Sequence, residues 1–135
     1  MNAILREHGS ETVHDQVVSM VSMRWSKAFV CKVTTKAGLD QNAWSEPQQL
    51  CDIVGWYVSS GGDTVEWMAE VETEDSLGDA HIVDKWRKAM RRGIPFYLLV
   101  PRGMKDFVMR LCQEQSLTVS YIYEFTFING VCHIL

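Results

Sequence analysis

Residues 51–73 read CDIVGWYVSSGGDTVEWMAEVET, and this stretch decides the fold. Two segments rich in β-branched and aromatic residues, 51–59 and 64–73, flank the turn sequence Ser60-Gly61-Gly62-Asp63, a pattern typical of a β-hairpin. Side chains alternate between the two faces of a strand, so Glu70 and Glu72 share one face of the second segment. The stretch therefore predicts a central hairpin with two acids side by side.

The spacing of apolar residues predicts the elements around the hairpin. Helical spacing covers 11–24 and 104–112, and a further helix is expected from an N-cap at Ser76 to Arg91-Arg92-Gly93. Strands are expected over 28–34, 96–100, 119–127 and 131–135, with a polar loop over 36–49. The order α-β-β-β-α-β-α-β, with one more strand, predicts a mixed sheet flanked by helices in one α/β domain over 1–135.

Length and composition fit a domain that is stable without disulfides or a structural metal. The chain has 135 residues, of which 47% are hydrophobic and 22% are charged. No apolar run approaches the ~20 residues of a membrane span, and the first residues lack a signal-peptide core. We therefore expect a cytoplasmic protein with no membrane partner. The four cysteines form no C-x-x-C pair, so we favour reduced, buried thiols over a zinc site built from distant Cys and His.

Charge is distributed unevenly along the chain. The segment 37–84 carries acids and no Lys or Arg, whereas residues 85–135 are rich in Lys and Arg. This asymmetry fits a metal-binding centre beside a phosphate-binding surface, but charge alone favours two solvated faces that partly neutralise each other.

Asp52, Glu70 and Glu72 are the strongest candidates for a chemical role. Glu is disfavoured in strands, and two neighbouring carboxylates raise the cost of ionising each other unless a cation lies between them. Asp52 on the neighbouring strand lies within reach of the pair. Carboxylate oxygens are ligands that Mg²⁺ accepts together with water and phosphate oxygens.

The register of the hairpin decides whether the three acids meet. A tight two-residue Gly61-Gly62 loop would pair Asp52 with Val71 and turn its side chain to the wrong face. We therefore expect an odd-numbered loop or a β-bulge that pairs Asp52 with Glu70 or Glu72.

With these residues, the chain resembles the PD-(D/E)XK nuclease superfamily, the restriction-endonuclease-like three-layer fold with core order αβββαβ. Cys51-Asp52 stands where that family often has Pro-Asp, and Glu70-Val71-Glu72 stands where it has acid-x-Lys. The similarity spans roughly residues 11–123. It includes small members with a Glu-Val-Glu-Thr strand followed by Asp75-Ser76, a helix near Trp86 and a strand reading FYLLVP.

The resemblance implies a Mg²⁺- or Mn²⁺-dependent nuclease that acts on DNA. Asp52 and Glu70 would bind the metal, and Glu72, which replaces the family lysine, would bind metal or orient the attacking water. Lys85 or Lys88 could supply the missing positive charge, and Glu11 stands where some relatives place a further metal-binding acid. A DNA-binding surface would draw on the basic residues of the following helix: Lys85, Arg87, Lys88, Arg91 and Arg92.

Several alternatives stay open at this point. The first rival, which the Lys-to-Glu change motivates, is a non-catalytic module of the same fold that binds nucleic acid or a protein. The second rival is an unrelated α/β interaction domain in which the acids are ordinary surface residues. Homodimerisation is also open. Lys85, Lys88 and Glu11 are each more simply surface residues, and His14 and His81 are expected to be surface or partly buried histidines rather than general bases.

Overall fold

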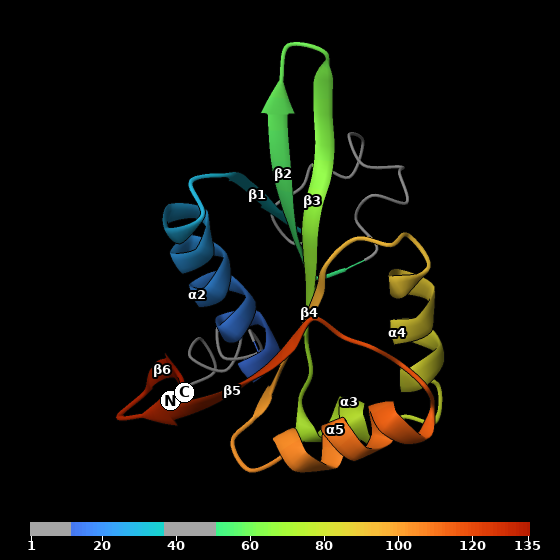
Figure 1. The fold of residues 1–135 in the computed structure, drawn as a ribbon. Helices are drawn as coiled ribbons and strands as arrows, with labels where there is room; N and C mark the ends of the chain where they lie inside the picture. The colour runs from blue at the N-terminus through green and yellow to red at the C-terminus, as the bar shows by residue number, and fades with distance from the viewer. Residues whose placement is uncertain (1–11, 37–50) are drawn as a thin grey trace.

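The computed structural model describes residues 12–36 and 51–135, which form an α/β fold around a curled, six-stranded mixed sheet (Figure 1). The strands are β1 (Lys32–Thr35), β2 (Ile53–Ser59), β3 (Gly62–Val71), β4 (Phe96–Pro101), β5 (Tyr121–Ile128) and β6 (Val131–Ile134), adjacent in that order. β3–β4 and β4–β5 pair in parallel and the other neighbours are antiparallel, which confirms the expected mixed α/β sheet.

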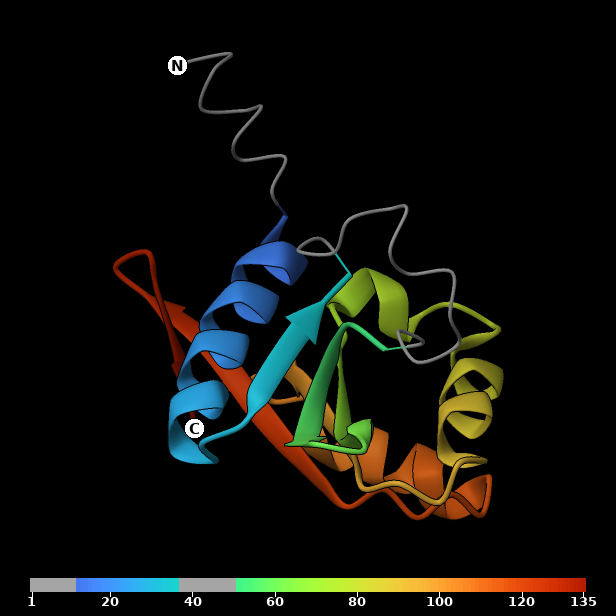
Figure 2. The ribbon, with the colours of Figure 1, turned by 90° about the horizontal axis from the view of Figure 1, so that it is seen from above.

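Helices pack on both faces of the sheet. The helices are α2 (Val13–Ala28), α3 (Glu74–Leu77), α4 (Ile82–Met90) and α5 (Lys105–Glu114). α2 buries Val17 and Val21 against one face, whereas α4 and α5 bury Trp86 and Val108 against the other (Figure 2). Because both faces are covered, the central parallel strand β4 is apolar along most of its length, as the run FYLLV predicts.

The first helix is longer than its apolar spacing predicts. α2 continues to Ala28, so the strand expected over 28–34 is wrong at its start, and β1 begins only at Lys32. Trp25 explains the extension, because its ring makes edge-on contacts with Trp67 and Tyr97 on the sheet. This packing outweighs the β propensity of the following residues.

The β2–β3 hairpin contains the expected irregularity. Ser59 pairs with Gly62, so the turn is the two-residue Ser60-Gly61. The register then shifts between Gly55 and Trp56, where a β-bulge absorbs one extra residue of β3. Ile53 consequently pairs with Ala69, which sets Asp52 level with Glu70. The prediction of a bulge is confirmed.

The helix expected from Ser76 is divided in two. Thr73, not Ser76, caps α3, and the two side chains form a reciprocal capping box. The chain then turns through Gly78 before α4 begins at Ile82, so the predicted N-cap was wrong by three residues. Besides its part in the capping box, Ser76 donates from its hydroxyl to Glu72 at the end of β3.

Some predictions lie outside the described residues, namely the role of Glu11 and the loop over 37–49. No helix within 12–36 and 51–135 is both long and apolar enough to cross a membrane. Cys51, Cys112 and Cys132 are buried and Cys31 is partly buried, and none of the four is joined in a disulfide.

Candidate functional site

Three acids lie in the interior where β2 begins and β3 ends. Asp52 immediately precedes β2, Glu70 is the last but one residue of β3, and Glu72 follows its end. Their exposed fractions are 8%, 2% and 0%. Charged residues are almost never buried to this degree unless they are paired, so each carboxylate needs identified partners.

Asp52 and Glu70 are in direct contact. The backbone N–H of Asp52 donates a 2.5 Å hydrogen bond to Oε1 of Glu70. One residue along, the N–H of Val71 donates to Oδ2 of Asp52 over 2.9 Å. These reciprocal bonds connect β2 and β3 where their regular ladder ends, and they follow from the register that the bulge sets.

His14 reaches this pair from α2, the helix that packs on the face of the sheet opposite to α4. Its Nε2 lies 2.9 Å from Oδ2 of Asp52, and its Nδ1 lies 3.0 Å from Asp15. The hydrogen bond to Asp52 is the main cause that raises the pKa of His14 to about 9, so the imidazole is a cation that donates through both nitrogens at neutral pH. From sequence alone His14 is expected to be a surface or partly buried histidine, because only the tertiary packing of α2 brings it to Asp52.

Lys85 reaches the two glutamates from α4. Its Nζ lies 3.2 Å from Oε2 of Glu70 and 3.1 Å from Oε2 of Glu72. The side chain is half exposed, so its ammonium group lies between the buried carboxylates and solvent. Burial lowers the pKa of Lys85, but the charges of Glu70 and Glu72 more than compensate and hold it above its usual value.

Glu72 is held by hydrogen bonds on both carboxylate oxygens. The hydroxyl of Ser76 donates to Oε1 over 2.8 Å, and the indole N–H of Trp86 donates to Oε2 over 2.9 Å. With Lys85 added, this carboxylate is well satisfied although it is fully buried. Glu72 therefore fixes α3 and α4 to the end of β3.

The pKa values of Glu70 and Asp52 are shifted in opposite directions. Burial raises the pKa of Glu70 to about 8, with the neighbouring charge of Asp52 as the next cause. Burial also raises the pKa of Asp52, but the hydrogen bond and charge of His14 outweigh it and bring the pKa below its usual range. With Glu70 protonated, the cations His14 and Lys85 balance Asp52 and Glu72.

A divalent ion fits two of the acids better than three. Within the described part of the chain, no three His, Cys, Asp or Glu side chains are grouped closely enough to hold a metal ion. The oxygens of Glu72 are used by three donors, Ser76, Trp86 and Lys85, whereas those of Glu70 are used by two, the N–H of Asp52 and Lys85. Asp52 and Glu70 are hard oxygen donors in contact, which matches the one or two carboxylates through which Mg²⁺ is usually held.

The basic residues of α4 and its end have different surroundings. Lys85 contacts the acids, whereas Lys88 is exposed on the same helix. Arg87 donates to the backbone carbonyl of Gln115 over 3.0 Å and is therefore engaged in packing. Arg91 and Arg92 are exposed where α4 ends.

A surface cleft lies next to the acids. It has a volume of about 610 Å³, with His14 and Val13 on one side and Thr73, Glu74 and Asp75 on the other. His14 lines this cleft and contacts Asp52, so its imidazole lies between the cleft and the buried acid pair.

No protein-family model, no curated protein and no solved structure matches this chain. The functional proposal below is accordingly carried by the side chains of the site.

Proposed function

We propose that this protein is a metal-dependent phosphodiesterase that cleaves DNA, with a fold of the restriction-endonuclease-like type. The observation that carries the proposal is the position of Lys85, whose Nζ lies 3.2 Å from Glu70 in an interior site that also holds Asp52. An acid pair beside an ammonium group provides ligands for a hard cation and a positive charge for a phosphate. The order of α2, β1, β2, β3, α4 and β4 also agrees with the core order αβββαβ.

Each residue has a separate role in this proposal. Asp52 and Glu70 would hold Mg²⁺ or Mn²⁺, which supplies polarisation of the phosphate and a bound water of lowered pKa. Lys85 supplies the charge that the family places at position 72, and it is better situated for this than Lys88. Glu72 orients Lys85 and ties it to Trp86 instead of binding metal.

Lys85 has to leave one partner to act on a substrate. Its ammonium contacts both glutamates, and its side chain is 45% exposed. When a metal ion takes the place of the proton on Glu70, the charge of the ion repels the ammonium group of Lys85, which can turn toward a phosphate oxygen while Glu72 still holds it. DNA would be bound electrostatically by the cations of α4 and its end, among them Lys88, Arg91 and Arg92.

A cleavage assay tests the proposal. Purified protein with Mn²⁺ or Mg²⁺ is incubated with end-labelled single-stranded, duplex and branched DNA. We expect cutting that EDTA stops and that Asp52→Ala and Glu70→Ala each abolish, while Asp75→Asn, an exposed acid of the neighbouring cleft, leaves it unchanged. Absence of cutting on all three substrates, with metal binding established by calorimetry, would contradict catalysis.

One observation favours a second candidate, a non-catalytic module of the same fold. Lys85 and Glu72 are joined with Trp86 in a network that also serves folding, so the ammonium group has a structural reason to be there. The two candidates differ in one result, because the module would bind DNA without cutting it.

A further inference from the structure

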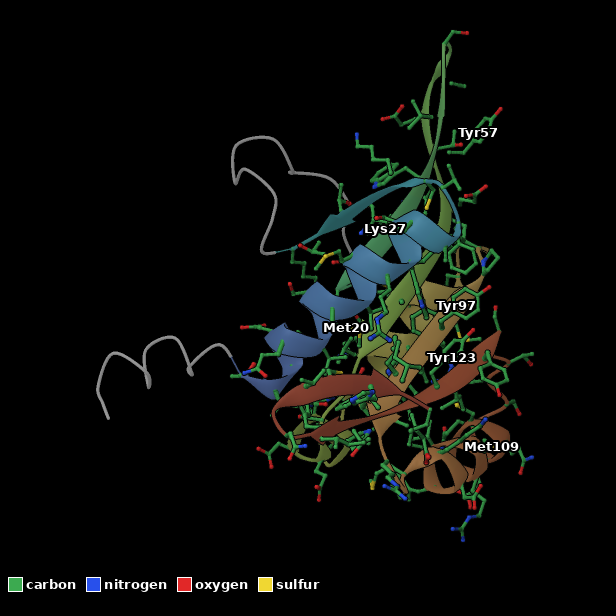
Figure 3. The ribbon with its side chains drawn as sticks, turned by 90° about the vertical axis from the view of Figure 1, so that its left-hand side faces the viewer. Met20, Lys27, Tyr57, Tyr97, Met109 and Tyr123 are labelled. Atoms are coloured by element: carbon green, nitrogen blue, oxygen red, sulfur yellow. The ribbon has the colours of Figure 1, made fainter. Side chains whose placement is uncertain are left out.

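A row of aromatic side chains lies on the sheet face that α2 only partly covers. Trp25, near the end of α2, contacts Tyr97 on β4 with ring centroids 5.8 Å apart and Tyr123 on β5 at 5.3 Å. Tyr123 in turn lies 4.7 Å from Tyr121. Figure 3 shows Tyr97 and Tyr123 one above the other beside α2. We call Trp25, Tyr97, Tyr123 and Tyr121 the aromatic row.

The row passes from the core to solvent. Trp25, Tyr97 and Tyr123 are partly buried, whereas Tyr121 is 49% exposed. Tyr121 also borders a cleft of about 330 Å³, which Met109 and Leu117 line together with Ser120. The outer end of the row is therefore the half-exposed ring of Tyr121, which stands at the edge of a cleft with room for a nucleobase.

A cation is fixed on the outermost ring. Nζ of Lys105 lies 4.3 Å from the ring centroid of Tyr121 and 3.1 Å from its hydroxyl. Lys105 lines the same cleft. A positive charge at an aromatic face beside a cleft suits a ligand that has both a flat ring and a negative group.

Cationic residues adjoin both ends of the row, Arg24 and Lys27 in the sequence beside Trp25 and Lys105 on the ring of Tyr121. The segment 16–36, which contains Trp25, includes Arg24 and Lys27 and no acid. Burial raises the pKa of Cys132 on β6 and the charge of Arg24 opposes this, so α2 carries a cation within electrostatic range of β6. The carboxylate of Glu124 accepts from the backbone N–H groups of Gly103 and Lys105, which occupies the acid of this strand.

We propose that the aromatic row, Lys105 and the adjacent cleft bind single-stranded nucleic acid, with an unpaired base stacked on Tyr121. Aromatic rings stack on any base, and nearby cations hold the phosphates without reading sequence. A duplex keeps its bases stacked on each other, so it cannot use these rings. The site goes beyond the proposed nuclease function, because it needs no metal and none of the three buried acids.

Fluorescence anisotropy in EDTA tests this site separately from cleavage. The probe is a fluorescein-labelled oligothymidylate of about 12 nucleotides, a length within the range that single-strand sites cover. We expect Tyr121→Ala to weaken binding about five-fold or more and Tyr121→Phe, which keeps the ring, to bind as the wild type does. Lys105→Gln should lower the slope of log affinity against log salt by about 0.7.

Tyr57→Ala is the matched control, since Tyr57 is 59% exposed on the projecting β2–β3 hairpin and lies well away from Tyr97 and Tyr123 (Figure 3). This variant should bind the probe normally. Three results would overturn the proposal: equal affinity for the oligothymidylate and for its duplex, equal losses in Tyr57→Ala and Tyr121→Ala, or unchanged probe binding by Tyr121→Ala together with loss of a dimer in sedimentation. The last result would assign the row to contact between copies of the chain.

Discussion

The indole N–H of Trp86 donates a 2.9 Å hydrogen bond to Oε2 of Glu72, and both side chains are completely buried. A carboxylate at this depth is tolerated because Ser76 and Lys85 satisfy the rest of it. Glu72 is thus an internal brace between β3 and the helices α3 and α4. This role changes what a substitution at position 72 can reveal.

The substitution Glu72→Lys should destabilise the protein. The new ammonium group would face the cation Lys85 and the N–H of Trp86 in place of the carboxylate that both use, and breaking a buried ion pair in this way costs about 3–5 kcal/mol of the free energy of unfolding. Glu72→Gln keeps an acceptor for Ser76 or Trp86 and should cost less, about 1–3 kcal/mol. Urea denaturation followed by circular dichroism measures both values, and a Glu72→Lys variant as stable as the wild type would show that Glu72 is not a brace.

Stability should fall as pH rises through the titration of His14. The pKa of this imidazole is raised to about 9 in the folded protein by Asp52, against about 6.5 when unfolded. Its contribution is therefore complete below pH 6.5 and is lost as pH increases to 9. Because the side chain is 33% exposed, we expect a contribution of about 1–2 kcal/mol instead of the full linkage value.

The difference between wild type and His14→Gln isolates this effect. In urea denaturation at intervals from pH 6 to 9.5, the variant should lose less stability over the window than the wild type loses. His81→Gln is the control, because His81 is 86% exposed and should leave the profile unchanged. Parallel profiles for wild type and His14→Gln would show that the contact with Asp52 contributes no stability.

Much of this arrangement could be predicted from the sequence, and the limits are physical. The turn Ser60-Gly61-Gly62-Asp63 and the alternation around Glu70 are local signals, so the hairpin and the placement of Glu70 and Glu72 side by side were predictable. The expectation that Asp52 meets Glu70 also predicted an odd-numbered loop or a bulge, and the structure has the bulge. The roles of His14 and Trp86 were not predictable, since each depends on where a helix packs, and periodicity does not specify which side chains of two elements meet.

A divalent ion should stabilise the protein through Asp52 and Glu70. An ion present at about 100 times its dissociation constant adds about 2.7 kcal/mol to a state that alone binds it, which corresponds to a Tm rise on the order of 5–10 °C. The rise should vanish in Glu70→Gln and persist in Asp75→Asn. Because burial raises the pKa of Glu70 to about 8, the ion displaces a proton and should bind more tightly at pH 8.5 than at pH 6.5. Metal binding that is independent of pH would place the ion elsewhere.

Gly55 is the position at which the bulged hairpin tolerates no side chain. A Cβ at this residue would overlap the indole ring of Trp67, which is itself buried. Gly55→Ala should therefore cost about 2–3 kcal/mol of the free energy of unfolding. Among the described residues, the indole N–H of Trp67 is a buried side-chain donor without an acceptor. The substitution Trp67→Phe therefore removes this unsatisfied group and also the part of the ring that a Cβ at position 55 would overlap.

A double-mutant cycle tests this relationship. In the Trp67→Phe background, Gly55→Ala should cost at least about 1 kcal/mol less than in the wild type, because the overlapping part of the indole is absent. Equal costs in the two backgrounds would mean that the close approach of Trp67 to Gly55 does not limit the hairpin.

Lys85 is the residue through which catalysis and structure can be separated. If its ammonium stabilises charge on the phosphate, Lys85→Met should lower the cleavage rate about 10²–10³-fold, and Lys85→Arg should restore part of it. Lys88→Met on the same helix is the matched control, and it should weaken binding of long DNA slightly without lowering the rate at saturating substrate. Loss of Lys85 also leaves Glu70 and Glu72 without their cation, so the rates have to be measured below the melting temperature of each variant. Equal rates for the two methionine variants, with both proteins folded, would remove Lys85 from the reaction and leave it as a partner of the buried acids.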